Sequence, residues 1–544
     1  MPLLRSHRIL LAGLIALTIA GPTRSARADM AQEDAIRAHL EFLASDLLEG
    51  RAAGSRGYDI AATYVAAQFQ MLGLKPGGGD GTYLQKFDLV EATPVIPAAT
   101  VVLERNGERT GYEYATDFLP GTSYRSADAS VTAPMTFVGF GVSAPELGYD
   151  DLADVDLDGR IAVAFSGAPS TFSPNERAYY SWSGSKLQGL TERGAIGLVT
   201  LYVPDDLERV PWERRVAMSW VPRMRLLDSS GVPVDDFPQI RASVSFDTPK
   251  AATLFAGSGR TLDEAVGAAE RGEPQTFALE GRLTIALKTA LGKTSSSNVV
   301  GILEGSDPVL KSEFVVVTAH LDHIGRGAAI GGDTIYNGAY DNASGSAILL
   351  EIARSIVAAG PQKRSIVFAA VGAEERGLLG SDFFARNPPM AGGRIVANVN
   401  MDMPLALTPM ADLVAFGAQH SSLGAVAGRA AAAEGFSLTP DPFPEEVFFV
   451  RSDQFSFVRQ GIPALYFDSG ITSRDPAVDA KALMQRFLKQ NYHQPSDEIA
   501  LPIDYDTLAG LARTNVRVVT EVASASMAPR WNEGDFFGEK FGGH

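Results

Sequence analysis

The 544-residue sequence contains no cysteine, and only seven of its residues are histidine. Without thiols the chain can form no disulfide bond, and a metal site in it has to be built from His, Asp and Glu side chains. Because histidine is this scarce, the histidines that stand near acidic residues are the first candidates for metal ligands.

Basic charge is also in deficit, since 47 Lys and Arg residues face 64 Asp and Glu residues and leave a formal net charge of −17. This charge argues against nucleic acid and anionic membrane surfaces as partners. The hydrophobic fraction is 45% and the charged fraction is 20%. Both values are ordinary for a globular protein and exclude global disorder.

Long hydrophobic runs are absent except near the start of the chain. Arg5 and Arg8 precede an uncharged run from Ile9 to Ala20, and Ala26-Arg27-Ala28 follows with the small-x-small pattern of a secretory cleavage site. We predict a signal peptide over residues 1–28 and a periplasmic or secreted mature protein with no membrane contact. The run is too short to span a bilayer comfortably, and an uncleaved membrane anchor is the alternative interpretation.

The pattern of apolar residues after the signal peptide predicts helices over 31–48 and 57–72. Between about Phe87 and Phe246, short β-like runs are broken by Gly, Pro and Asp, and only 179–193 is typical of a helix. From residue 298 onward the two types alternate, with strands expected at 298–303, 314–319, 365–371, 395–401 and 464–467, and helices at 344–359, 378–386, 422–433 and 505–524. We therefore predict an α/β fold, a mostly parallel mixed sheet covered by helices on both faces, with an inserted, mainly β module.

A chain of this length is long for one domain and comfortable for two. The change in pattern divides the mature chain into an N-terminal part of the main domain, the inserted module, the rest of the main domain, and an aromatic tail that we expect to dock on the body. The corresponding boundaries are 29–110, 111–289, 290–525 and 526–544.

Candidate site residues follow the predicted strands, and ligands in such sheets bind beyond the carboxyl ends of the strands. His320 ends the strand 314–319, and Asp322 stands two residues on, where a carboxylate could orient the imidazole. Taken alone, a histidine at a strand end is more often a structural hydrogen bonder. Asp341 stands where a helix begins, so its ordinary interpretation is an N-cap, although one oxygen could cap the helix while the other binds an ion.

Further acidic residues stand at the ends of two other predicted strands. Glu374 and Glu375 directly follow 365–371, and adjacent carboxylates repel each other unless cations or protons offset their charge. In a solvated loop the pair would have no special role, but at the same sheet edge as His320 it suggests one metal ligand and one general base. Asp402 follows 395–401, and an acid so close to a strand interior needs a partner.

The last candidates lie in Tyr492-His493-Gln494-Pro495-Ser496-Asp497, ahead of the final predicted helix. His493 would complete a set of metal ligands gathered from distant segments. Tyr492, beside it, is a candidate donor to a tetrahedral oxyanion. Simple aromatic packing is an equally good interpretation of this tyrosine.

The order and wording of these segments resemble the co-catalytic zinc peptidases that include the bacterial leucyl aminopeptidases, with glutamate carboxypeptidase as a more distant relative. The resemblance extends over Glu41-Phe-Leu-Ala-Ser-Asp-Leu-Leu-Glu-Gly-Arg51, Tyr336-Asn-Gly-Ala-Tyr-Asp341-Asn-Ala-Ser-Gly345, and Arg451-Ser-Asp453-Gln-Phe with Gly461-Ile-Pro463. The inserted module resembles a protease-associated domain through Phe137-Val-Gly-Phe-Gly-Val-Ser-Ala-Pro145 and Gly194-Ala195.

This resemblance implies two Zn²⁺ ions per chain and a role for each candidate. The implied roles are His320 and Asp402 on one zinc, Glu375 and His493 on the other, Asp341 bridging both, Glu374 as general base, and Asp322 orienting His320.

The implied function is that of an exported metallo-aminopeptidase, a hydrolase acting on peptides with a free N-terminus. A carboxypeptidase-like or dipeptidase-like zinc hydrolase is the alternative within the family. Arg451 would then anchor the substrate carboxylate, unless it pairs with Asp453 or another acid. A third hypothesis is a non-catalytic receptor in which the inserted module binds partners, and the complete set of metal residues argues against it.

Overall fold

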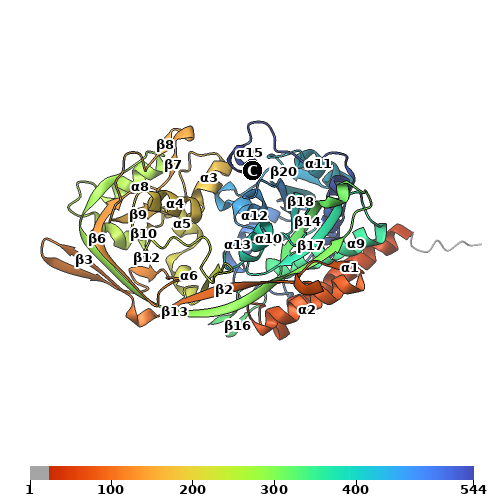
Figure 1. Ribbon diagram of the computed structural model, residues 1–544, viewed down its shortest axis with the longest axis horizontal. Coiled ribbons are helices and arrows are strands. Elements are labelled where there is room, and N and C mark those ends of the chain that lie inside the picture. The colour runs from red at the N-terminus through yellow and green to blue at the C-terminus, as the bar shows by residue number, and fades with distance from the viewer. Residues whose placement is uncertain (1–23, 391, 544) are drawn as a thin grey trace, which may run out of the picture.

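The computed structural model describes residues 24–390 and 392–543 and shows two lobes side by side (Figure 1). We call the lobe that carries the N-terminal helices and most of the C-terminal half the main lobe. The side lobe is built around the strands between residues 100 and 287. Most of the predicted signal peptide, residues 1–23, lies outside the described part of the chain. Within the described part, no helix is both long and apolar enough to cross a bilayer.

The main lobe is built on a mixed sheet whose four central strands, β17, β14, β18 and β21, are parallel. The strand β13 pairs with β17 on one side, and β19 pairs with β21 on the other, both antiparallel. In spatial order the strands are β11 (Arg223–Leu226), β2 (Leu84–Pro94), β13 (Phe277–Leu303), β17 (Ser365–Val371), β14 (Glu313–His320), β18 (Arg394–Asn400), β21 (Ala464–Ser469), β19 (Asp412–Phe416) and β20 (Ser437–Thr439).

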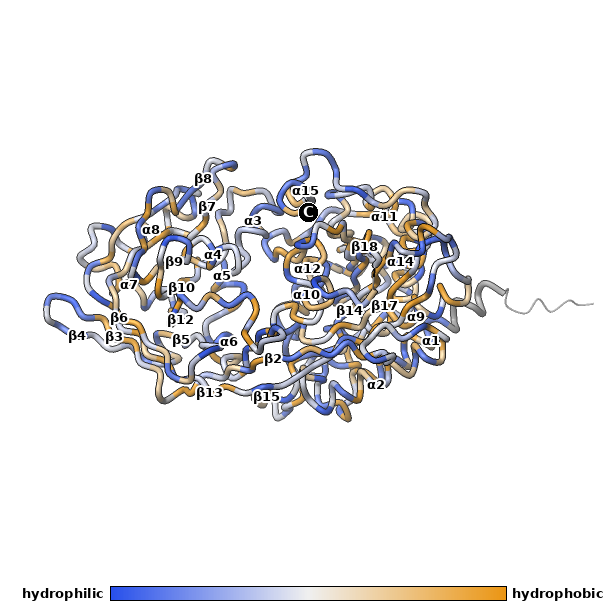
Figure 2. The backbone as a smooth tube through the Cα atoms, in the orientation of Figure 1, coloured by the Kyte–Doolittle hydropathy of each residue, from blue (hydrophilic) through white to orange (hydrophobic). Residues whose placement is uncertain are grey.

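Alternate residues of the central strands face opposite sides of this sheet, as the two-residue period of a strand requires. Val315 and Val317 of β14 pack into the core beneath one set of helices, whereas Val316 packs beneath the other set. The first set is α1 (Arg24–Leu43), α2 (Arg56–Met71), α9 (Gly345–Ala359), α11 (Leu423–Ala433) and α14 (Tyr505–Ser524), and the second is α10 (Leu379–Arg386) and α12 (Gln454–Val458). Hydrophobic stretches accordingly run through the centre of this lobe (Figure 2). The predicted fold, a mostly parallel mixed sheet covered on both faces, is confirmed.

The 27-residue strand β13 joins the two lobes. Its residues from Thr289 onward pair with β2 and β17 in the main lobe, while its first half pairs with β3 and β6 in the side lobe. The sequence predicts only the end of this strand, at 298–303. Since one continuous strand belongs to both sheets, the lobes share backbone hydrogen bonds rather than a flexible linker.

The side lobe contains a second mixed sheet in the order β4–β3–β13–β6–β9–β10–β12–β5, with β6, β9, β10 and β12 parallel. Its strands are β3 (Thr100–Arg105), β4 (Glu108–Tyr112), β5 (Phe118–Pro120), β6 (Asp128–Phe137), β9 (Ile161–Phe165), β10 (Gly197–Leu201) and β12 (Ala242–Phe246). The strand β3 lies before residue 110 and β4 spans it, so the predicted division at 110 falls within β4, inside this sheet.

The side lobe is richer in helix than the sequence pattern indicates. The helix expected at 179–193 is two helices, α3 (Pro174–Ser181) and α4 (Ser183–Glu192), separated at Trp182, and the expectation of no other helix before Phe246 is wrong. The structure adds α5 (Pro204–Arg209) and α6 (Trp212–Ala217), followed by α7 (Ala252–Phe255) and α8 (Leu262–Glu270). Helices of about six residues are too short to show a helical period, and a proline at the first turn starts a helix rather than breaking one.

The C-terminal tail lies against both lobes. Phe537 of α15 (Phe536–Phe541) is fully buried against the main lobe, where it contacts Phe449, Phe455 and His420. Phe536 packs on Tyr179 of α3 in the side lobe. The tail thus adds a second connection between the lobes, on the side of the molecule opposite to β13 (Figure 1).

We expect Phe537→Ala to lower the free energy of unfolding by about 3–5 kcal/mol, because it removes a fully buried aromatic ring and leaves a cavity. Urea denaturation of the full chain measures this loss. The matched control is Glu539→Ala, an exposed position on the same helix, for which about 0.5 kcal/mol or less is expected. Equal effects of the two changes would show that the tail does not stabilise the body.

Candidate metal centre

The candidate residues converge at the carboxyl ends of three adjacent parallel strands. His320 ends β14, Glu374 and Glu375 follow β17, and Asp402 follows β18. Neighbouring parallel strands end at the same edge of a sheet, which is why residues 82 positions apart in sequence come into contact there. His493 follows α13 (Ala480–Gln490) and reaches the same edge from the other side.

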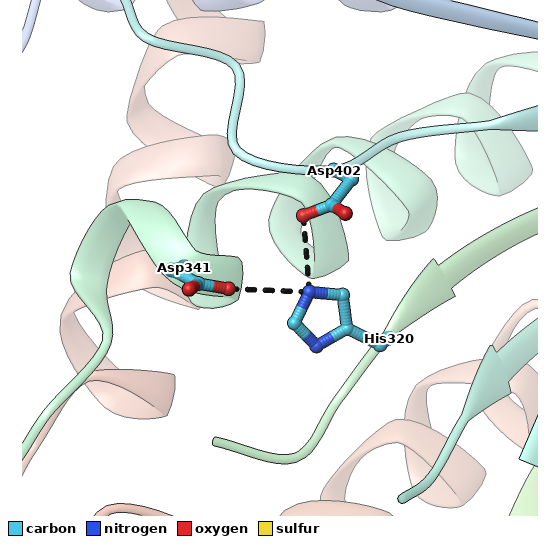
Figure 3. Close-up of side chains that lie close together, drawn as sticks. All are labelled: His320, Asp341 and Asp402. Carbon is cyan, nitrogen blue, oxygen red and sulfur yellow. Dashed lines mark hydrogen bonds and ion pairs between the residues drawn. The ribbon is translucent and has the colours of Figure 1, made fainter. Parts of the chain in front are cut away.

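His320, Asp341 and Asp402 form the first group of this centre. The Nε2 atom of His320 lies 3.0 Å from Asp402 Oδ1 and 3.3 Å from Asp341 Oδ1 (Figure 3). All three ligand atoms lie within 4.8 Å of one another, a spacing that could hold one metal ion.

A second group shares Asp341 with the first. His493 Nε2 lies 3.2 Å from Asp341 Oδ2 and 3.2 Å from Glu375 Oε2. On the other side, His323 Nδ1 lies 2.6 Å from Glu375 Oε1 and 3.8 Å from Asp341 Oδ2. The two oxygens of Asp341 therefore face two separate groups, as a residue between two ions has to do.

The structure does not support the interpretation of Asp341 as a helix N-cap. Its carboxylate contacts the imidazoles, and the neighbouring Asn342 accepts the hydrogen bond from Gly345 N at the start of α9. Asp341 itself lies in the irregular turn Ala339–Ser344, where its main-chain N–H donates to Asp497. Both of its carboxylate oxygens are thereby left for the site.

Asp322 does not contact His320 in the way the sequence suggests. The Nδ1 atom of His320 lies 3.1 Å from the main-chain oxygen of Asp322, not from its carboxylate. That carboxylate instead accepts hydrogen bonds from the main-chain N–H groups of Glu374 and Glu375, at 3.0 and 3.3 Å. The spacing of two residues correctly predicts that Asp322 lies close to His320, but the predicted contact between its carboxylate and the imidazole is wrong. The main-chain N–H groups that follow β17 bind this carboxylate instead.

The buried acids and imidazoles of the cluster shift one another's pKa values. Burial would by itself raise the pKa of the Asp341 carboxyl, but the imidazoles of His323, His320 and His493 hold it well below its ordinary value. Burial would lower the pKa of His493, yet Glu375 and Asp341 raise it to about 9. The site thus favours positive charge at its centre.

Glu374 differs from the other acids of the centre. It lines the cavity together with Asp402 and His493, while its main-chain N–H is held by Asp322. Burial and the negative charge of Asp402 raise the pKa of Glu374 well above its ordinary value, in spite of the opposing effect of His320. A carboxyl group with a raised pKa that faces a cavity is suited to accept and return a proton.

Tyr492 and Arg451 lie at the rim of the centre. The Tyr492 ring stacks on His493 at a centroid distance of 3.8 Å, and its hydroxyl accepts a 3.3 Å hydrogen bond from Arg451 Nη2. Arg451 also pairs with Glu446, at 3.1 Å, and not with Asp453. The stacking on His493 agrees with the packing interpretation of Tyr492, and its role as a donor to a tetrahedral oxyanion stays a prediction.

Three residues of the site were missed from the sequence: His323, Asp497 and Arg51. Asp497 accepts hydrogen bonds from the main-chain N–H groups of Tyr340 and Asp341, both at 3.0 Å. Arg51, fully buried, donates to the carbonyl oxygens of Leu321, Asn337 and Gly338. His323 directly follows Asp322 in the sequence. Its position beside the His320-x-Asp322 motif was a signal from which it could have been identified.

The centre opens into a cavity of about 760 Å³ between the lobes. Asp341, Glu374, Glu375, Asp402 and His493 line its floor, and Trp182 and Leu187 of the side lobe line the opposite wall. Arg214 of α6 reaches from the side lobe to the carbonyl oxygens of Leu488, Lys489 and Tyr492, at the end of α13. The side lobe thus helps to hold the loop that carries His493.

The fold and the site define an α/β protein with a two-part cluster of potential metal ligands at the carboxyl ends of parallel strands. Residues 298–519 match the model of peptidase family M28. The matched region contains every residue of the cluster.

Parts of the chain are also similar to named aminopeptidases. The chain is 31% identical over 147 residues to aminopeptidase YwaD of Bacillus subtilis (strain 168). The matched residues make up 27% of this chain and 30% of that relative. The chain is 28% identical over 236 residues to leucine aminopeptidase 1 of Trichophyton rubrum, covering 42% and 58%. These matches span less than two thirds of either relative. An aminopeptidase from Aneurinibacillus sp. strain AM-1 shares the fold, with a TM-score of 0.52 at 19% identity over 91% of this chain and 95% of that chain.

Proposed function

We propose that the protein is an exported aminopeptidase with two zinc ions that removes N-terminal residues from peptides. The observation that carries the proposal is the position of Asp341, whose Oδ1 faces His320 and whose Oδ2 faces His493. The match of residues 298–519 to peptidase family M28 and the similarity to named aminopeptidases support the reaction class. Export rests on the sequence of residues 1–28, and the side lobe is proposed to be a protease-associated domain on its sequence motifs.

The donor set fits zinc, because it consists of imidazole nitrogens and carboxylate oxygens without any thiolate. We assign His320 and Asp402 to one ion, Glu375 and His493 to the other, and Asp341 to both. His323 then holds the Oε1 atom of Glu375 while Oε2 faces His493. When bound, two zinc ions would polarise the scissile carbonyl and make water more acidic.

Glu374 is proposed to carry the proton. Its carboxylate accepts a proton from the attacking water and returns it to the nitrogen of the leaving amine. Asp322 contributes by fixing the main chain of Glu374, so that the side chain stays directed into the cavity. Tyr492 is a candidate donor to the oxyanion, since its hydroxyl accepts from Arg451 and keeps its own proton available.

The aminopeptidase and carboxypeptidase hypotheses are separated by parallel assays of the purified protein. We expect aminoacyl anilides with a free α-amine to be hydrolysed roughly 100-fold or more efficiently, in kcat/KM, than N-acylated dipeptides. Activity only on the N-acylated substrates would reject the proposal and favour a role for Arg451 in binding a substrate carboxylate. No hydrolysis of either set by protein containing zinc would favour the non-catalytic hypothesis.

A further inference from the structure

The wall of the cavity beside the metal centre carries an acidic residue that the proposed mechanism does not use. The parallel pairing of β18 with β21 places Asn400 opposite Tyr466. Two residues beyond this pair come Asp402, a proposed zinc ligand just past the end of β18, and Asp468 of β21, which lines the same cavity. Asp468 and the proposed metal ligands therefore line one cavity.

Asp468 differs from the other acids that line the cavity outside the metal centre, Asp235 and Asp382. These two form ion pairs with Arg386 and Arg459. Within the described part of the chain, the Asp468 carboxylate accepts hydrogen bonds only from main-chain N–H groups, those of Leu405 at 3.0 Å and Ser469 at 2.6 Å. No Lys, Arg or His of the described residues forms an ion pair with it, although only 7% of Asp468 is exposed. A buried carboxylate without a cation is costly, and an entering cation would offset that cost.

The surroundings of Asp468 are apolar. Met403, Leu405, Phe448, Met484 and Leu488 line the cavity on the same side. An apolar wall that ends in a single carboxylate matches a side chain with an aliphatic stem and a cationic head, because Lys and Arg bury the stem while the head finds a polar partner.

We infer that Asp468 binds the cationic side chain of a substrate whose N-terminal residue is Lys or Arg. This inference rests on the proposed aminopeptidase function and deepens it, since it names the substrate class. The free α-ammonium of any peptide offers the same chemistry to a carboxylate. The apolar residues beside Asp468 favour the side chain, because an α-ammonium has no stem to bury.

The experiment compares lysyl and norleucyl anilides, which share the aliphatic stem and differ in the ammonium group. We expect wild-type protein to have the higher kcat/KM for the lysyl substrate. In Asp468→Asn, the ratio of lysyl to norleucyl kcat/KM should fall roughly 10- to 100-fold, the range for loss of one hydrogen bond to a charged group. The asparagine oxygen can still accept from Leu405 and Ser469, so the wall should keep its shape. The matched control is Asp441→Asn, which removes the same charge from an acid outside the cavity lining and should leave the ratio unchanged.

Calorimetric titration of the wild-type protein with lysinamide and norleucinamide gives a second readout, which needs neither turnover nor a folded variant. Tighter binding of lysinamide is expected. A loss of activity in Asp468→Asn that is equal for both anilides would assign the carboxylate to the α-ammonium and overturn the inference. Equal binding of the two amides would also overturn it. In both cases hydrolysis of the norleucyl anilide by wild type would leave the aminopeptidase function standing, whereas no hydrolysis of either anilide would overturn both.

Discussion

Glu374→Ala is expected to lose most peptide hydrolysis while keeping its metal. Among the described acids of the centre, Glu374 alone forms no ion pair with an imidazole, and it lines the cavity. Removing a general base costs typically 10²- to 10⁴-fold in rate, so we expect kcat to fall by about that factor. Because the alanine variant leaves all five proposed ligands intact, zinc content should stay that of the wild type.

Two measurements on the same preparations test this prediction: kcat with an aminoacyl anilide, and zinc per chain by elemental analysis. Glu375→Gln is the matched comparison, since it changes the adjacent acid, which contacts His323 and His493. That variant should lose metal as well as activity. Unchanged turnover in Glu374→Ala would reject the general base, and loss of zinc from it would assign Glu374 to the metal instead.

Asp341→Asn should have the largest effect on metal binding. Both carboxylate oxygens of Asp341 face imidazoles, and the amide of asparagine offers one oxygen in place of two. We therefore expect weaker binding of both zinc ions. The loss of zinc affinity should exceed the roughly 10- to 100-fold that follows removal of a residue that only hydrogen-bonds a metal ligand. Activity should fall with the metal content.

Zinc competition with a chelator, followed by elemental analysis, measures this effect. Asp497→Asn is the control, because Asp497 supports a proposed ligand without being one. It accepts hydrogen bonds from the main-chain N–H groups of Tyr340 and Asp341. The loss of zinc affinity in this variant should stay within about 10- to 100-fold. Wild-type zinc content in Asp341→Asn would contradict a bridging role and with it the two-ion centre.

Some of the site was predictable because strand ends carry local signals. The buried strands Phe314–Ala319 and Ser365–Val371 show as apolar runs, and the alternation with helices predicts that they are parallel. Parallel neighbours end at one edge, so His320, Glu374 and Asp402 could be placed together before any coordinates were known. The sequence offered no such signal for His493, whose position near them was suggested by the resemblance to zinc peptidases.

Other features depend on side-chain direction. His323 and His320 lie three residues apart just past a strand, and only the turn between them determines that one faces Asp402 and the other Glu375. The carboxylate of Asp322 similarly had a plausible partner in sequence, yet it binds the main chain of the next strand's loop. Such side-chain contacts depend on the position of each residue in the folded protein, which the spacing of residues in the sequence does not specify.

The sequence by itself determined the class of fold, the edge of the sheet where polar residues collect, and the residue types available to bind metal without cysteine. Those properties follow from local periodicity and composition, which act before any distant contact forms. Only the tertiary structure decided that β13 links two sheets, that Arg214 of the side lobe holds the loop of His493, and that Asp468 in the cavity wall forms no ion pair with any described residue. Each of these depends on which distant segments pack together, and that choice is made by the burial of the whole core rather than by any single stretch of chain.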